Sequence, residues 1–370
     1  MRKTLSFALA LAGVSIVPAL SSAQGHAVGA VYTLTNNASG NAVQIYNRYS
    51  DGHLQAGPAV PTGGNGSGAG LGSQGAVTLT DGNNFLLAVN AGSNTISAFR
   101  VGSNGLALTD VAPSGGIAPI SIAQNGNLVY VLNAGDGSHV GNVQGFRLDR
   151  WGNLTRLPGA FANLSGIGAG PAEVLFNPTG NTLVVTEKST NKIDTFKLNF
   201  LGWPVAASYQ ASNGATPFGF DVDPRGRLFV AEANGGAVDG SSLSSYRIER
   251  DLDLDTISPS APTTETAACW AIVSKDGKYV YTTNAGSGTV SGYRISRDGS
   301  VELLNSDGVT ASTGAGSHPI DLNFSNDGKF LYVLANGAPT IAGFRFNSNG
   351  SLTSVGTIGA STTYSGLAVR

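Results

Sequence analysis

The chain has 370 residues, of which 41% are hydrophobic and only 12% are charged. Its 21 Lys and Arg residues against 23 Asp and Glu residues leave a net charge of −2, which argues against nucleic acid or an anionic membrane as the main partner, because both need a basic face. The 52 glycines are about twice the usual share of ~7% but do not recur every third residue, which excludes collagen, and apolar runs that continue to the end exclude a disordered chain.

The first 23 residues predict a secretory signal peptide. Arg2 and Lys3 give a positive start, residues 5–17 are apolar, and residues 21–23 are small, so we expect cleavage before Gln24. This predicts a signal peptide over 1–23 and one domain over 24–370, in a secreted or periplasmic protein. An N-terminal membrane anchor is the alternative, although the apolar run is short for a span of ~20 residues. No membrane span is expected in the mature chain.

A unit of four short apolar strands then recurs along the chain. Its first turn ends in glycine, and a short Asn/Gly loop follows the second strand. Copies cover residues 75–108, 120–157, 171–207, 217–257, 269–304 and 319–355. The first-turn glycines are Gly82, Gly126, Gly180, Gly226, Gly277 and Gly328. Four strands per ~50 residues predict an all-β fold, a β-propeller, in which hairpin turns need the positive φ that glycine accepts.

A seventh copy is split between the two ends of the chain. Residues 30–60 supply only three strands, and residues 365–369 form an isolated apolar strand. We therefore predict a single seven-bladed β-propeller, closed by pairing of the C-terminal strand with the N-terminal blade. Closure removes a free sheet edge that would invite aggregation. Between the first two copies, residues 61–74 (PTGGNGSGAGLGSQ) are interpreted as a flexible inter-blade loop rather than a phosphate-binding loop.

The single cysteine, Cys269, excludes an internal disulfide and cysteine-based zinc sites. The fold must therefore be held by its core and its sheet ladders. A small buried thiol is the expected role of Cys269, since a nucleophile would need a neighbouring base and no histidine is adjacent in the sequence.

Two of these copies resemble a known family. The segments GPAEVLFNPTGNTLVVTE (170–187) and DGKYVYTTNAGSGTVSGYRISRDGSVELL (276–304), with YVTN-type repeats, are similar to lactonase-type seven-bladed propellers. That group includes 6-phosphogluconolactonases and carboxymuconate lactonising enzymes. The resemblance covers about residue 28 to Arg370 and implies a hydrolase that opens a lactone or a related cyclic acid, or a muconate cycloisomerase-like enzyme.

The chain departs from the motifs of this family. Blade four has Gly170-Pro171-Ala172 where family members carry His-Pro-His, and blade seven keeps His318-Pro319 but continues with Ile320. A Pro-Arg-His element is also missing. The basic half of the family site is thus mostly absent, whereas Glu187 and Glu232 match the family's glutamate at the end of a second strand.

Topology places the starts of the first strands and the ends of the second strands on one rim, at the mouth of the central channel. Residues at these positions include Asn90, Asn133, Glu187, Lys188, Glu232, Asn284, Glu173, Phe218, Trp270, His318 and Asp321. On the family resemblance, Glu187, Glu232 and His318 are the candidate catalytic residues, which would activate water. Lys188, Trp270, Asn90, Asn133 and Asn284 are the candidate substrate-binding residues, which would hold the oxyanion or the ring.

Each candidate also has a purely structural interpretation. The asparagines head turns that asparagine favours by bonding its own backbone. Glu187 and Lys188 can form a solvated pair, Glu232 can meet a buried partner, and Trp270 can plug the channel. No cofactor or metal site is expected, with a divalent cation left open.

Two classes of function therefore remain. The first is an exported lactonase-like hydrolase that acts on a small-molecule lactone. The second is a non-catalytic propeller that binds a ligand, a carbohydrate or a protein. In either case we expect a monomer without a nucleic-acid partner.

Overall fold

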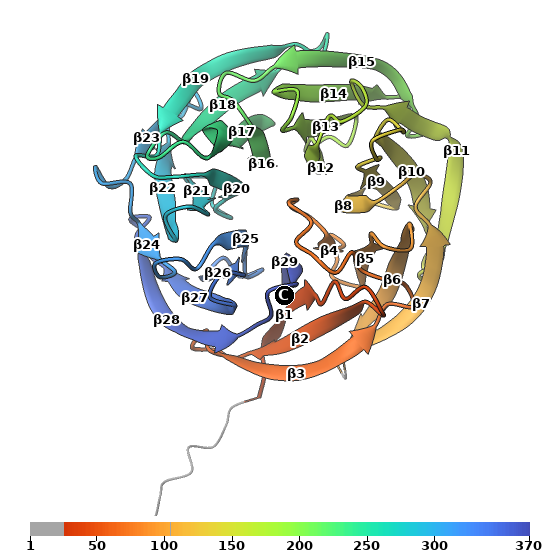
Figure 1. Ribbon diagram of the computed structural model, residues 1–370, viewed down its shortest axis with the longest axis horizontal. Helices are drawn as coiled ribbons and strands as arrows, with labels where there is room; N and C mark the ends of the chain where they lie inside the picture. Colours follow the sequence, from red (N-terminus) through yellow and green to blue (C-terminus); the bar gives the residue numbers. More distant parts are fainter. Residues whose placement is uncertain (1–25, 104) are drawn as a thin grey trace, which may run out of the picture.

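The computed structural model describes residues 26–103 and 105–370, so the predicted signal peptide lies outside the described residues. The described chain forms seven antiparallel sheets arranged in a ring around one axis (Figure 1). The predicted seven-bladed propeller is confirmed. The only helix in the described part is η1 (Asn234–Gly236), and no helix there is long and apolar enough to span a membrane.

Each blade contains four strands, from the axis outward. The inner strands are β29 (Ser365–Val369), β4 (Val77–Leu79), β8 (Pro119–Asn125), β12 (Pro171–Phe176), β16 (Pro217–Val222), β20 (Ala268–Val273) and β25 (Pro319–Phe324). The second strands are β1 (Gly29–Leu34), β5 (Phe85–Asn90), β9 (Leu128–Asn133), β13 (Thr182–Glu187), β17 (Arg227–Glu232), β21 (Tyr279–Asn284) and β26 (Phe330–Ala335).

The third and outer strands complete blades 1 to 7 in the same order. The third strands are β2 (Ala42–Arg48), β6 (Thr95–Gly102), β10 (Asn142–Leu148), β14 (Lys192–Leu198), β18 (Ser242–Ile248), β22 (Thr289–Ile295) and β27 (Thr340–Phe346). The outer strands are β3 (Leu54–Pro61), β7 (Gly105–Pro113), β11 (Leu154–Asn163), β15 (Pro204–Ala211), β19 (Leu254–Pro262), β23 (Val301–Leu303) and β28 (Leu352–Gly359). In blade 6 a short strand, β24 (Ala311–Ser312), also pairs with β22.

The ring closes where the sequence predicts. Strand β29 pairs antiparallel with β1, with Val369 opposite Val31 and Ala368 opposite Tyr32. Two backbone hydrogen bonds join Ala30 to Arg370, at 3.2 and 2.8 Å. The last strand of the chain thus supplies the inner strand of the first blade.

Adjacent blades are tied together by a repeated tyrosine bond. Tyr130, Tyr281 and Tyr332, each in a second strand, donate their hydroxyls to the carbonyls of Gly202, Gly350 and Gly52 in the next blade, at 2.6 to 2.7 Å. The aromatic rings are buried between the sheets. This arrangement fills the inter-blade core and satisfies the hydroxyl, which burial would otherwise penalise.

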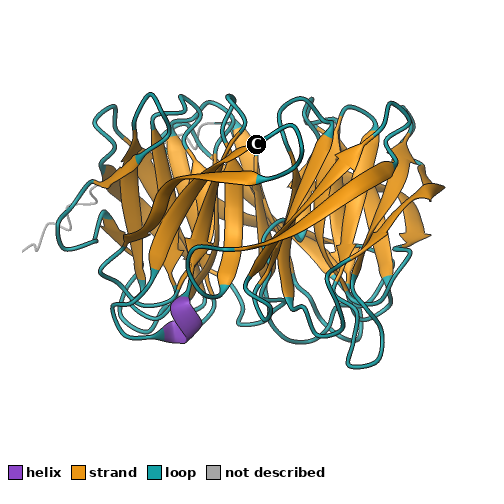
Figure 2. Cartoon of the chain, turned by 90° about the horizontal axis from the view of Figure 1, so that it is seen from above, coloured by secondary structure: helices purple, strands orange, loops and turns teal. Residues whose placement is uncertain are grey.

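The two faces of the ring carry different connections. The hairpin face carries the turns between inner and second strands, such as residues 80–84, and those between third and outer strands, such as residues 149–153. The crossover face carries the loops between second and third strands and the connections from one blade to the next, such as residues 62–76. In the side view of Figure 2, η1 lies on the crossover face and the C-terminus on the opposite side.

Candidate functional site

The two glutamates proposed as catalytic lie inside the blades. Glu232, at the end of β17, is fully buried. Its carboxylate accepts hydrogen bonds from the amide of Gly214 and the hydroxyl groups of four serines, at 2.6 to 3.1 Å: Ser212, Ser242, Ser244 and Ser260. Gly214 and Ser212 belong to the crossover that enters from blade 4, so Glu232 anchors that crossover to β18 and β19.

Glu187 occupies the same place in blade 4. Its carboxylate accepts bonds from the Ser165 amide at 2.8 Å and from the hydroxyls of Ser165 and Thr190. Burial opposes its ionisation, but hydrogen bonds from Asp194, Ser165 and Thr190 outweigh burial and lower the pKa of Glu187. Burial raises the pKa of the facing Asp194 carboxyl to about 9, and both the hydrogen bond to Glu187 and the negative charge of Glu187 act in the same direction. Asp194 is therefore protonated at neutral pH.

The three candidate asparagines are the equivalents of these glutamates in blades 2, 3 and 6. Asn90 and Asn284 each donate to two hydroxyls of the following strand at 2.8 to 3.1 Å, and Asn133 donates to Asn142 at 3.0 Å. All three are fully buried. The asparagine that ends the second strand therefore bonds to the start of the third strand of its own blade, and Asn90 and Asn133 also bond to Asn41 and Ser114, which precede their blades in the chain. His318 differs, since it is exposed on the crossover face with a left-handed φ of 48°.

The remaining two candidates, Lys188 and Trp270, do come together at the crossover end of the channel. The Lys188 ammonium lies 4.5 Å from the centre of the Phe218 ring, and the Phe218 and Trp270 rings are 4.8 Å apart. Burial lowers the pKa of Lys188 to about 8 and raises that of the neighbouring Cys269 thiol to about 12. Catalytic or binding roles for the eight candidates stay predictions.

This end of the channel is filled by the chain's own glycine-rich segment. Lys188 donates to the carbonyl of Gly72, and the Trp270 indole donates to that of Ser73 at 3.0 Å. The Gln74 side chain pairs with Ala271, donating to its carbonyl at 2.8 Å and accepting from its amide at 3.2 Å. We call residues 72–74 the plug. The segment that the sequence predicts as a flexible loop is thus bonded across the axis.

The close fit of the plug needs a glycine in the facing strand. A Cβ on Gly219 in β16 would lie 2.1 Å from the Gln74 side-chain oxygen, so a larger residue there would displace Gln74. The Ser73 hydroxyl donates to Ile120 at 2.8 Å, and the Gln74 amide donates to Ala172 at 3.1 Å. Four inner strands therefore hold the plug.

The channel is open at the other end, on the hairpin face. A cavity of about 370 Å³ lies there, with Gln74 in its wall and the first-turn residues Asp81, Lys275 and Asn326 around it. Its wall also carries three carboxyl groups, those of Glu173, Asp221 and Asp321, from three different inner strands. Glu173 and Asp321 are buried, and Asp221 is partly exposed.

Backbone amides hold these carboxyl groups in place. Glu173 accepts from the Phe220 amide of the next blade at 2.7 Å, and Asp221 accepts from the Val273 amide of the blade after that at 2.8 Å. Asp321 accepts from the Leu322 amide at 2.8 Å through Oδ1, while its Oδ2 has no hydrogen-bond partner. One carboxyl oxygen in the cavity wall is thus buried without a hydrogen-bond partner.

The three carboxyl groups have raised pKa values. Burial raises the pKa of Asp221 to about 6, against the opposing effect of two backbone hydrogen bonds. Burial also raises the pKa of Asp321 and, together with the charges of Asp221 and Asp321, that of Glu173. The cavity therefore combines Asp221, which is ionised at neutral pH, with two buried carboxyl groups whose pKa values burial raises well above the ordinary range. No cluster of three His, Cys, Asp or Glu residues in the described part of the chain has a metal-binding arrangement.

Sequence reasoning did not assign this cavity. From the sequence, Glu173 and Asp321 are predicted at first-strand starts on the opposite rim, and Asp221 is not among the candidates. The available signal was a carboxylate inside an inner strand that is otherwise apolar, as in PAEVLF, PFGFDV and PIDLNF. Such a residue needs either a backbone partner or a ligand.

The comparisons with known proteins point to one family. The family described as "Lactonase, 7-bladed beta-propeller" matches residues 30–162 and 226–365. No curated protein matches the chain in a sequence search.

Several solved structures share the fold. A putative 6-phosphogluconolactonase from Bacteroides fragilis is 19% identical, with a TM-score of 0.67 over 92% of this chain and 98% of its own. The periplasmic gluconolactonase PpgL of Pseudomonas aeruginosa is 16% identical, with a TM-score of 0.69 over 92% of this chain and 99% of its own. A protein from Lactobacillus plantarum is 14% identical, with a TM-score of 0.71 over 93% of this chain and 100% of its own. At such identities the similarity concerns the fold.

Proposed function

Because the chain belongs to the lactonase family of seven-bladed β-propellers, we propose that it hydrolyses a lactone, or a related cyclic carboxylic ester, in the hairpin-face cavity. The observation that supports this proposal is the set of three carboxyl groups, with pKa values raised to different degrees, around one cavity of about 370 Å³. Pockets of ~300 Å³ and above take small organic ligands. Carboxyl groups whose environments set different protonation states are suited to acid and base roles.

In the proposed reaction, the ionised Asp221 removes a proton from water as the water oxygen attacks the lactone carbonyl carbon. Glu173, in the protonated form that burial favours, donates a hydrogen bond to the oxyanion that forms. The ring carbon–oxygen bond then breaks, and Asp321, in the protonated form that burial favours, gives its proton to the leaving oxygen. The product is the open hydroxy acid, and proton exchange with solvent returns Asp221 and Asp321 to their starting states.

The test is a pH-indicator assay of the purified protein with a panel of aldono-, aryl- and acyl-lactones. We expect acid release that falls by about 10²- to 10⁴-fold in Asp221→Asn, the scale of a lost general base. Glu187→Gln and Glu232→Gln are the matched variants for the crossover face. Loss of activity in these two at unchanged melting temperature, with Asp221→Asn active, would move the chemistry to the glutamates first chosen from the sequence.

A non-catalytic binding propeller is the second candidate. It is favoured by the backbone bonds of Glu173 and Asp221, because a carboxylate that joins two blades has a structural use without catalysis. Folded protein that releases no acid from any lactone of the panel, yet binds a lactone or carbohydrate in calorimetry, would support this candidate instead.

Export is a separate part of the proposal. The signal peptide predicted over 1–23 and the similarity to a gluconolactonase described as periplasmic both favour a secreted or periplasmic location. N-terminal sequencing of the mature protein tests it, and we expect the sequence to begin at Gln24.

A further inference from the structure

Large apolar side chains are exposed on one sector of the ring. Of those exposed in the described chain, most belong to blades 2 to 4: Leu108, Trp151, Phe161, Ile167, Phe200, Leu201, Trp203, Val205 and Tyr209. Trp151 is 58% exposed and Phe200 is 94% exposed. We call Trp151, Phe200, Leu201 and Trp203 the apolar prongs. They lie on the hairpin face, in the turns β10–β11 and β14–β15 of the adjacent blades 3 and 4 (Figure 1).

The same turn in the other blades is polar. Its third position is occupied by Asp51, Asp251, Asp298 and Asn349 in blades 1, 5, 6 and 7. Each of these side chains accepts a hydrogen bond from the amide two residues later, at 3.0 to 3.3 Å. The third residue therefore normally caps the turn.

Blades 3 and 4 move this cap to the first position of the turn. Asp149 accepts from the amides of Trp151 and Asn153 at 2.8 and 2.9 Å. Asn199 accepts from the amides of Leu201 and Trp203 at 2.9 and 3.0 Å. The residue at the third position therefore does not cap the turn, and in both blades this residue is apolar and exposed.

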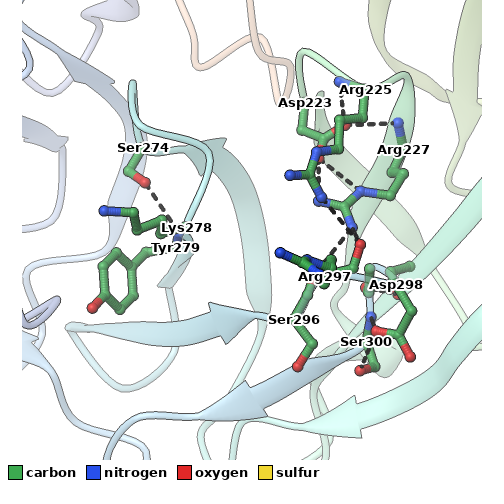
Figure 3. Close-up of polar contacts among 12 residues, drawn as sticks. Asp223, Arg225, Arg227, Ser274, Lys278, Tyr279, Ser296, Arg297, Asp298 and Ser300 are labelled. Atoms are coloured by element: carbon green, nitrogen blue, oxygen red, sulfur yellow. Dashed lines mark hydrogen bonds and ion pairs between the residues drawn. The ribbon is translucent and has the colours of Figure 1, made fainter.

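Both turns are held rigidly. Arg100 of blade 2 donates to the carbonyls of Arg150 and Trp151 at 3.2 Å. Figure 3 shows the equivalent contact in blade 6, where Arg225 and Arg227 reach the carbonyls of the turn that contains Asp298. In blade 4 the turn is fixed by Tyr130, which donates to the Gly202 carbonyl at 2.6 Å. A backbone fixed in this way loses little conformational entropy on binding.

Cations accompany the prongs. Arg150 lies 4.0 Å from the centre of the Trp151 ring, and exposed Arg147 lines one hollow with Phe200 and Leu201. Asp149, the one acidic side chain of these two turns, caps the blade 3 turn. By contrast, the blade 5 turn carries Glu249, Asp251 and Asp253. Two exposed arginines, Arg147 and Arg150, therefore lie beside the apolar prongs.

We propose that the apolar prongs dock this face of blades 3 and 4 on a bilayer surface that contains anionic lipids. Tryptophan and phenylalanine side chains enter the interfacial region, while Arg147 and Arg150 contact the headgroups. Stable binding to a bilayer surface generally takes two signals, and the sector supplies apolar and cationic groups together. A second copy of the chain fits less well, because a side chain as free as Phe200 offers no flat surface to an identical partner.

Vesicle flotation tests this proposal. The probes are vesicles of phosphatidylcholine alone and of phosphatidylcholine mixed with phosphatidylglycerol. We expect the mature protein to float with the mixed vesicles and to be released at about 1 M salt, where charges are screened within ~3 Å. Absence of flotation with the mixed vesicles, or equal flotation with both kinds, overturns the proposal.

The decisive variant restores the turn chemistry of the other blades through Trp151→Asp, Phe200→Ser and Leu201→Asn. We expect binding to fall by at least about tenfold, with the melting temperature unchanged because the prongs are exposed. Arg147→Gln with Arg150→Gln should weaken binding by about fivefold per arginine. The matched control is Val238→Ser, which removes an apolar side chain that is 81% exposed on the crossover face and should leave binding unchanged.

Two results of these variants would also overturn the proposal. One is flotation of the triple variant equal to that of the unaltered protein. The other is a dimer in sedimentation velocity that the triple variant dissociates while neither protein floats, which would identify a second copy as the partner.

Discussion

The two ends of the central channel use buried polar groups in different ways. At the crossover end, Gln74 closes the channel, and Glu187 and Glu232 are enclosed in their blades by hydrogen-bond donors. At the hairpin end, a cavity remains and Asp321 keeps an oxygen without a partner. A buried carboxylate with all of its donors supplied fixes a structure, whereas one that lacks a partner is available to a ligand.

The difference between the ends originates in one long connection. Residues 62–76 join blade 1 to blade 2, whereas residues 114–118 and 212–216 suffice for the same step at blades 2 to 3 and 4 to 5. The additional length carries the plug to the axis.

The largest expected effect is on stability, at the crossover end. Glu232→Ala leaves the Gly214 amide and four serine hydroxyls without their common acceptor. We expect a loss of about 3 kcal/mol in the free energy of unfolding, measured by denaturant titration. Glu232→Gln, which keeps an acceptor oxygen, should lose less. If Glu232→Ala unfolds at the same denaturant concentration as the original protein, the hydrogen bonds of Glu232 do not contribute to the stability of the fold.

The next effect is on activity, at the hairpin end. Asp221 must be ionised to act as a base, so kcat/KM should rise about tenfold between pH 5 and pH 7, through its pKa of about 6. In the folded protein this pKa lies above the ordinary 3.8, so Asp221 contributes to stability in its protonated form. That contribution is lost as pH rises from about 4 through about 6, and the loss should be smaller in Asp221→Asn. A flat activity profile over this range would exclude Asp221 as the base.

The sequence was sufficient to predict the fold, but it could not show which end of the central channel holds the cavity. Glycine turns and apolar strands predict the repeat, and the isolated strand 365–369 predicts that the ring closes. These patterns can be recognised because they depend on local chemistry. Topology also brought Lys188 and Trp270 to one mouth. It did not reveal that Gln74 fills that mouth, because the path of a glycine-rich connection depends on bonds to Ala271 and Ile120, which are distant in sequence.

The sequence also does not predict which way a side chain at the end of a strand points. Glu187 and Asn90 stand at the same position of the repeat, which topology places near the channel. Whether such a residue faces the channel or its own blade is decided by donors such as Ser165, which arrive from the preceding blade.

A smaller effect concerns Asp194, a protonated carboxyl at the crossover end. Its pKa of about 9 lies above the ordinary 3.8, so its protonated form stabilises the fold, and stability falls as pH rises through about 9. Asp194→Asn keeps a donor toward Glu187 without needing a proton. We expect the variant to lose about 1 kcal/mol less per pH unit between pH 7 and pH 9, in unfolding titrations at each pH. Lactonase activity should not change. A variant that is equally sensitive to alkali would show that Asp194 does not supply the proton.

The smallest expected effect tests the plug, and Cys269 provides the probe. As the single cysteine of the chain it is buried near Lys188, which the plug covers, and its high pKa of about 12 makes it a poor nucleophile. Gln74→Ala removes both bonds to Ala271, each worth about 1 kcal/mol, so the mouth should open more often. We expect labelling of Cys269 by a thiol reagent to accelerate about fivefold to thirtyfold, with little change in melting temperature. Gln124→Ala, at a hydrogen-bonded glutamine of the hairpin face, is the control and should label at the original rate. Gln74 lines the cavity, but backbone amides hold Glu173, Asp221 and Asp321, so lactonase activity should survive in Gln74→Ala. A loss of activity in step with faster labelling would mean that the two ends of the channel act as one site.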